Sequence, residues 1–250
     1  MKPNVIILTS GLSGSSVLTG LIGSAGYWTG DVTHKKPQYD TFENEELIEL
    51  NLRLLRDVGY TGNYLMEFSQ QAIDAVHAYY SRADHHAYLL FVNKCEENRP
   101  WIWKDPRLWL TIRFWKNFIA LQNCRFILLT RDLMQTWVSQ TLRRQITTYR
   151  YSRHYEQSIQ ASALQFFREN SLPYLRVRYE DLIVAPAETV RSLNDFLSTS
   201  LTVEHLKAVY HKPLYKSPKS SLAKYLKAAA IYLKNYSGRL DLTVERKSRT

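Results

Sequence analysis

Near the amino terminus, seven consecutive residues have the composition of a loop that binds an anion. They are Ser10, Gly11, Leu12, Ser13, Gly14, Ser15 and Ser16. Glycine permits backbone conformations that turn successive N–H groups toward one point, and a following helix adds the positive end of its dipole. The serine hydroxyls can donate further hydrogen bonds or cap that helix. We therefore expect this loop to wrap around an anion.

The loop differs from the one that binds ATP or GTP. The pattern G-x-x-x-x-G-K-[ST] requires a lysine directly after its second glycine, whereas Ser15 follows Gly14 here. The missing lysine argues against binding of the Mg²⁺-bound β- and γ-phosphates of ATP or GTP. The letters GLSGS also resemble the start of the adenylylsulfate kinase loop. A nucleotide-type kinase with a degenerate loop is therefore kept as an alternative.

The segments around the loop predict an α/β fold with a central parallel β-sheet flanked by helices. Residues 5–8 are continuously apolar, as in a strand buried on both faces, and the apolar spacing in 17–22 indicates a helix. Alternating strands and helices favour such a sheet, within one domain covering residues 1–250. Ligands bind there beyond the carboxyl ends of the strands. Further strands are predicted at 101–103, 125–129 and 175–179, the last near a sheet edge, and helices at 47–58, 132–144 and 157–169.

Five segments, taken in order, resemble the sulfotransferases that use 3′-phosphoadenosine 5′-phosphosulfate (PAPS), most of all bacterial members whose loop reads R-S-G-T-S. The resemblance runs from Val5 to about Leu197 and implies a P-loop-like sulfotransferase architecture. The segments are the loop with LTGLIGSAGYWTGD, YDTFE from Tyr39, WKDPR from Trp103, Arg131 with Ser139 eight residues later, and RYEDL from Arg178 with Pro186 and Phe196-Leu197.

The resemblance implies transfer of a sulfuryl group from PAPS to a hydroxyl or an amine. The loop would hold the 5′-phosphate, and Lys104 would neutralise charge on the bridging oxygen of the donor. Arg131 and Ser139 match the pair that binds the 3′-phosphate, for which a guanidinium and a hydroxyl are suitable ligands. Arg107 would orient the donor or pair with Asp105.

Glu43 is the predicted general base for the acceptor, and His34 is the second candidate. One residue departs from the family pattern, because Leu12 stands where the family carries a basic residue against the 5′-phosphosulfate. A replacement cation would come from Lys104 or from the tail lysines Lys216 and Lys219.

Charge and cysteine content narrow the function classes. The formal net charge is +10, and residues 204–250 hold eleven Lys or Arg against three acidic residues. This basic carboxyl-terminal segment indicates an anionic partner. The two cysteines exclude a CxxC metal or redox site, and no apolar run reaches the ~18 residues of a membrane span. We expect a cytoplasmic protein that needs no metal.

The acceptor is expected to be a small molecule or a carbohydrate, bound by the variable segments 28–40, 63–84 and 149–160. A nucleic-acid partner is not expected, since no RNP-like or finger motif accompanies the aromatic residues. A non-catalytic protein that binds a nucleotide or nucleic acid is kept as the third interpretation, which Leu12 favours.

Overall fold

The computed structural model describes residues 2–209 and 221–242. Four parallel strands form its central sheet, in the order β4-β1-β5-β6. The strands are β1 Asn4–Leu8, β4 Ile102–Lys104, β5 Cys124–Thr130 and β6 Tyr174–Arg178. All four predicted strands are confirmed, as is the position of β6 at an edge of the sheet. The predicted α/β class with a parallel sheet is confirmed with them.

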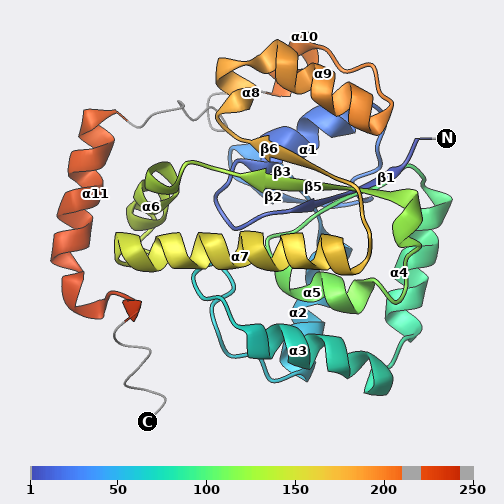
Figure 1. Cartoon of the computed structure of the whole chain (residues 1–250), viewed down its shortest axis with the longest axis horizontal. Helices are drawn as coiled ribbons and strands as arrows, with labels where there is room; N and C mark the ends of the chain where they lie inside the picture. The colour runs from blue at the N-terminus through green and yellow to red at the C-terminus, as the bar shows by residue number, and fades with distance from the viewer. Residues whose placement is uncertain (1, 210–220, 243–250) are drawn as a thin grey trace.

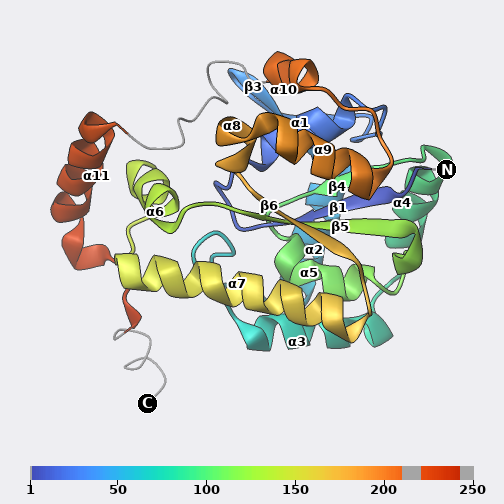
Figure 2. The ribbon, with the colours of Figure 1, turned by 45° about the horizontal axis from the view of Figure 1, so that its top comes forward.

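Helices cover both faces of the sheet (Figures 1 and 2). Strand β1 needs cover on both faces, because all four of its apolar side chains are fully buried. Val5 and Ile7 belong to one apolar core, and Ile6 and Leu8 belong to the other. The core with Val5 is closed by α1 Ser15–Gly23, α8 Asp181–Val184, α9 Pro186–Leu197 and α10 Val203–Val209. The core with Ile6 is closed by α2 Glu45–Asp57, α3 Gln70–Tyr79, α4 His86–Glu97, α5 Leu108–Trp115 and α7 Tyr149–Glu169.

A separate antiparallel hairpin connects α1 to α2. It consists of β2 Thr33–Lys36 and β3 Tyr39–Asn44. The Oδ1 atom of Asn44 accepts hydrogen bonds from the backbone N–H groups of Glu46 and Leu47 and so caps α2. Glu43 therefore belongs to the strand, whereas the acidic first turn of α2 is formed by Glu45 and Glu46.

Two helix predictions need correction. The helix expected at 132–144 is α6 Leu133–Leu142, with Asp132 as its amino-terminal cap. The helix expected at 157–169 starts eight residues earlier, at Tyr149, because the Thr148 hydroxyl accepts from the N–H of Tyr151 and caps it. Tyr151 and Tyr155 then pack inside the protein. Part of segment 149–160, which was predicted to contact the acceptor, is thus the buried side of a long helix.

The last described helix, α11 Leu222–Lys234, lies beside α6 at one end of the molecule (Figures 1 and 2). No helix in the described ranges has the length and apolar character needed to cross a membrane. Short 3₁₀ turns cover Tyr80–Arg82, Leu121–Asn123 and Tyr236–Gly238.

Candidate active site

A cavity of about 360 Å³ opens beyond the carboxyl ends of β1 and β4. This is the edge of the sheet at which the topology predicts a ligand. The glycine loop forms one wall, and the inner side of the β2–β3 hairpin forms another. The lining residues include Ser10, Gly11, Leu12, Gly14, Ser15, Ser16, His34, Lys36, Gln38, Tyr39, Thr41, Glu43, Tyr64, Lys104, Arg107 and Arg143.

The loop between β1 and α1 turns sharply at two residues with positive φ. Leu12 has φ 67° and Gly14 has φ 85°. A Cβ atom at Gly14 would lie 2.1 Å from Cδ2 of Tyr179, so this position requires glycine for space as well as for conformation. No side chain caps α1, whose first N–H groups have no acceptor within the helix. Ser15 and Ser16 therefore border the cavity without capping the helix, and the amino-terminal N–H groups are left for an external anion.

Buried polar contacts hold this loop from behind. The Thr9 hydroxyl donates to Ser13 Oγ at 2.6 Å and lies 3.0 Å from the carbonyl of Leu129 on β5. Ser13 is consequently buried and absent from the cavity wall, so its side chain supports the loop while only its backbone remains a candidate ligand. The Ser10 hydroxyl donates to Oε2 of Glu156 on α7 at 2.7 Å.

Glu156, which the sequence analysis missed, is a buried carboxyl group that contacts Ser10 at the start of the glycine loop. Its Oε1 atom is buried and has no hydrogen-bond partner among the described residues. Burial raises the pKa of this carboxyl from 4.5 to about 7, against the opposing effects of Ser10 and Arg131. Its sequence neighbourhood gives no signal, because only the fold brings residue 156 beneath residue 10.

Because the folded pKa of Glu156 is raised, its contribution to stability is present below about pH 4.5 and is lost as the pH rises through about 7. Glu156→Gln keeps an acceptor for Ser10. We expect this variant to be more stable than wild type at pH 8, with a free energy of unfolding about 1–3 kcal/mol higher. The difference should shrink toward pH 5. Urea unfolding at several pH values measures this, and parallel curves for the two proteins would contradict it.

Lys104 and Glu43 form an ion pair at the base of the cavity. Nζ of Lys104 lies 2.5 Å from Oε1 of Glu43, and the two side chains are 1% and 16% exposed. Lys104 ends β4 and Glu43 lies in β3, so sheet and hairpin together make the pair. A buried ammonium beside a partly accessible carboxylate places one cation and one potential proton acceptor in the same cavity.

Arg107 is oriented by two neighbours. Its Nη1 donates to both carboxylate oxygens of the buried Asp105, at 3.1 and 3.0 Å, and Nη2 donates to the Tyr64 hydroxyl at 2.6 Å. Burial raises the pKa of Asp105, and the nearby Arg107 opposes that rise. The expected pairing of Arg107 with Asp105 is therefore found, and the same guanidinium still borders the cavity.

Arg131 and Ser139 lie together behind the loop. Nη1 of Arg131 donates to the Leu12 carbonyl at 2.9 Å and to Ser139 Oγ at 3.1 Å. The guanidinium is centred 5.2 Å from the Tyr179 ring, and its Nε is buried without a hydrogen-bond partner in the described part of the chain. The predicted pair is thus in contact and is joined to the loop, although neither residue lines the main cavity.

Three further basic side chains border the cavity. His34 does so as predicted, whereas Lys36 and Arg143 were missed by the sequence analysis, and all three are exposed. Lys36 lies two residues after His34 on β2, a strand in which alternate side chains share a face. Arg143 follows Ser139 by four residues, the spacing of neighbours on one helix face. The hairpin spacing was not readable from the sequence, whereas the spacing of Arg143 from Ser139 lies within the helix predicted at 132–144.

Lys216 and Lys219 lie outside the described residues. Within the described ranges, no cluster of His, Cys, Asp and Glu has the arrangement of a metal site. Of the predicted acceptor segments, 28–40 contributes the hairpin wall and 63–84 contributes Tyr64 and Leu65. Tyr155 of the third segment donates its hydroxyl to the Tyr64 carbonyl at 2.8 Å and so supports the wall from behind.

Comparison with known proteins identifies the family. A sequence model described as the sulfotransferase family matches residues 3–202, and the chain belongs to that family. The sulfotransferase domain from the curacin biosynthetic pathway is 15% identical, with a TM-score of 0.53, over 90% of this chain and 82% of that one. Its likeness confirms the fold. Sulfotransferase STF9 from Mycobacterium avium is 13% identical, with a TM-score of 0.49, over 94% and 76%. No curated protein matches. Membership of this family indicates a transferase of sulfuryl groups.

Proposed function

We propose that the protein transfers a sulfuryl group from PAPS to a hydroxyl or amine of a small-molecule or carbohydrate acceptor. The observation that carries this proposal is the convergence of the uncapped amino terminus of α1 and the Lys104–Glu43 pair on one cavity. The donor supplies a sulfuryl group that is already activated, so no metal is required by this chemistry.

The residues present fit a nucleotide with phosphates at its 5′ and 3′ positions. The N–H groups at residues 13–16 suit the 5′-phosphate, because a helix amino terminus stabilises an anion. Arg131 and Ser139 suit the 3′-phosphate, since the buried Nε of Arg131 still has a hydrogen to donate. Arg107, fixed by Asp105 and Tyr64, would orient the donor from its place in the cavity lining.

Lys104 and Glu43 have complementary roles in this proposal. Lys104 would stabilise the negative charge that grows on the leaving phosphate, an interaction strongest in the transition state. Glu43 would accept the proton of the attacking hydroxyl or amine. Their ion pair keeps both groups in place and keeps each neutralised by the other before the substrates bind. His34, exposed on the hairpin, is the second candidate base.

A thermal-shift comparison tests the proposed donor. The full-length protein is heated alone and with 3′-phosphoadenosine 5′-phosphate, with ATP and Mg²⁺, or with an oligonucleotide. We expect only the first nucleotide to raise the melting temperature clearly. A shift with ATP and Mg²⁺ instead would support a kinase, and a shift with the oligonucleotide would support the non-catalytic interpretation.

We propose the cytoplasm as the location of the protein. The two cysteines are free and buried, which is consistent with a reducing compartment.

Leu12 provides a separate prediction, because it is half-buried at the cavity where the resemblance places a basic residue. We expect Leu12→Arg to bind PAPS about 5- to 150-fold more tightly, the effect of one charge-assisted hydrogen bond. Leu12→Met is the control for changes in packing, and calorimetric titration measures both. If the arginine variant binds no more tightly than the methionine variant, other cations already neutralise the phosphosulfate.

A further inference from the structure

One face of α11 consists of exposed apolar side chains. Leu222, Leu226 and Leu233 are 74%, 62% and 70% exposed. Their separations of four and seven residues place these side chains along one side of a helix. Such an aligned set differs from the isolated surface leucines that any protein carries.

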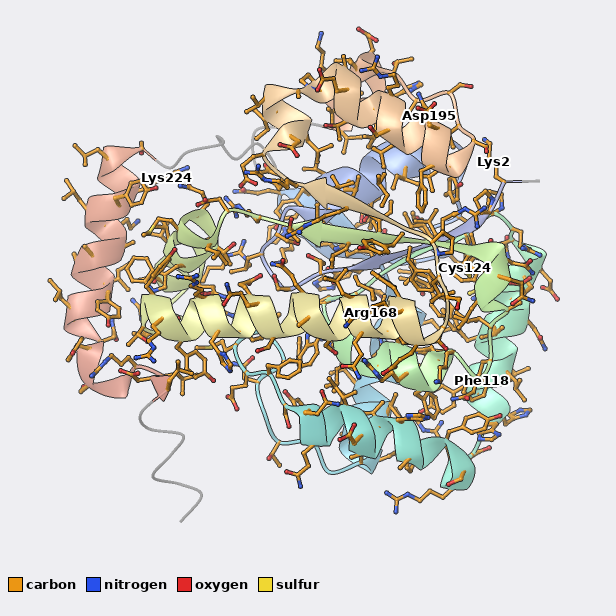
Figure 3. All side chains as sticks on the ribbon, viewed as in Figure 1. Lys2, Phe118, Cys124, Arg168, Asp195 and Lys224 are labelled. Atoms are coloured by element: carbon orange, nitrogen blue, oxygen red, sulfur yellow. The ribbon has the colours of Figure 1, made fainter. Side chains whose placement is uncertain are left out.

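An adjoining side of α11 already holds the helix to the protein. The Tyr225 hydroxyl accepts a hydrogen bond from Nε2 of Gln135 on α6 at 2.6 Å, and the Tyr232 ring lies 5.5 Å from the Trp137 ring. Ala228, between these tyrosines, is fully buried. Figure 3, in which Lys224 marks this helix, shows α11 at the margin of the molecule. The leucines therefore point away from the contacts that fix the helix.

The surroundings of this face are basic. Helix α11 carries Lys224, Lys227 and Lys234 and no acidic residue. The neighbouring segment 133–155 contains Arg143, Arg144, Arg150 and Arg153, all exposed, and also has no Asp or Glu. Backbone hydrogen bonds of Leu240 with Ile146 and Thr148 bring the two segments together. The only acidic residue described after α11, Asp241, lies 3.9 Å from Arg239. The exposed leucines thus belong to a strongly cationic end of the protein.

The basic residues around the leucines limit which kind of partner could bind this face. A second copy of α11 would bring lysines against lysines, which is unfavourable. Nucleic acid would match the charges and would leave the leucines in water. An anionic lipid surface matches both features, because interfacial helices place leucines at the boundary of the acyl chains and lysines among the lipid phosphates. Since each leucine is already largely exposed, insertion requires no rearrangement of the fold.

We propose that α11 and the neighbouring Arg144, Arg150 and Arg153 bind the surface of an anionic lipid bilayer. None of these residues lines the candidate active-site cavity. The residues that line this cavity lie within the range 3–202 that matches the sulfotransferase family, and α11 follows that range in the chain. Binding by this face would concentrate the enzyme at a membrane while the fold itself stays outside the bilayer.

Sedimentation of the full-length protein with vesicles tests the proposal. We expect binding to phosphatidylcholine vesicles containing about 30% phosphatidylserine to be at least tenfold tighter than to phosphatidylcholine alone, and to weaken with salt. The triple variant Leu222→Ser/Leu226→Ser/Leu233→Ser should lose at least about tenfold in affinity. Leu89→Ser/Leu90→Ser is the matched control, because these α4 leucines are 47% and 55% exposed. Circular dichroism checks that all the variants are folded.

A fluorescent label at residue 226 distinguishes insertion from simple charge attraction. Both native cysteines are buried, so Leu226→Cys provides an accessible thiol for an environment-sensitive dye. We expect a blue shift with phosphatidylserine vesicles and none for the same dye at Leu90→Cys. Equal binding of the triple variant and wild type, or no shift at position 226, would overturn the proposal. A dimer that is seen in sedimentation velocity and is lost in the triple variant, without any binding to vesicles, would also overturn the proposal. That result would assign the leucine face to a second copy of the chain.

Discussion

Replacing Lys104 by alanine is expected to lower the rate of sulfuryl transfer by about 10²- to 10³-fold while changing the affinity for 3′-phosphoadenosine 5′-phosphate much less. The reason is that the ammonium meets charge that is larger in the transition state than in the bound product. The rate is measured in single turnover with labelled PAPS and any acceptor that the wild-type protein sulfates in a screen of hydroxyl and amine compounds. Product affinity is measured by calorimetry.

Two companion variants make this result specific. Lys36→Ala removes a lysine from the same cavity without touching the ion pair, and should retain most of the rate. Glu43→Gln keeps the shape of the pair and should slow turnover by about 10²-fold, the usual contribution of a general base. A Lys104→Ala effect confined to the Michaelis constant would assign this residue to binding. Near-normal turnover of Glu43→Gln would transfer the proposed base to His34.

Arg131→Ala is expected to weaken the binding of 3′-phosphoadenosine 5′-phosphate by about 10- to 150-fold, the cost of one charge-assisted phosphate contact. The variant should weaken the binding of adenosine 5′-phosphate by no more than about fivefold. For this nucleotide the only loss is the hydrogen bond by which Arg131 supports the Leu12 carbonyl of the loop. Calorimetric titration of both nucleotides into both proteins gives the comparison.

Ser139→Ala serves as the matched variant for Arg131. It removes the hydroxyl that contacts Nη1 of Arg131 and leaves the contact of Arg131 with the loop in place. Its effect should therefore be smaller and still limited to the nucleotide with a 3′-phosphate. Equal losses for the two nucleotides in Arg131→Ala would mean that this arginine supports the loop and does not distinguish the 3′-phosphate.

Local patterns were sufficient to predict the framework of this fold. The apolar runs at 5–8 and 125–129 indicated buried parallel strands, and the alternation of apolar and basic residues at 175–179 indicated a strand near the sheet edge, as found. The glycine loop was equally readable, because a turn of this kind restricts residue type locally, as the φ of 85° at Gly14 shows. The start of α7 was missed because its cap, Thr148, precedes aromatic and basic residues whose burial depends on distant partners.

The site was predictable in its residue types and not in its contacts. Lys104, Glu43, Arg131 and Ser139 were each selected from sequence, but the Lys104–Glu43 pair depends on how a hairpin packs against the sheet. Glu156 gave no local signal, since a buried carboxylate 146 residues from its partner Ser10 looks like any helical glutamate in sequence. Long-range contacts of this kind become visible only after folding.

The most direct test of the account is a crystal structure of the full-length protein with 3′-phosphoadenosine 5′-phosphate. The account predicts the 5′-phosphate within hydrogen-bond distance of the N–H groups at residues 13–16 and next to Lys104. It also predicts the 3′-phosphate in contact with Arg131 and Ser139. A nucleotide bound elsewhere, or bound in this cavity with its 3′-phosphate away from Arg131, would contradict the proposed use of PAPS at this site.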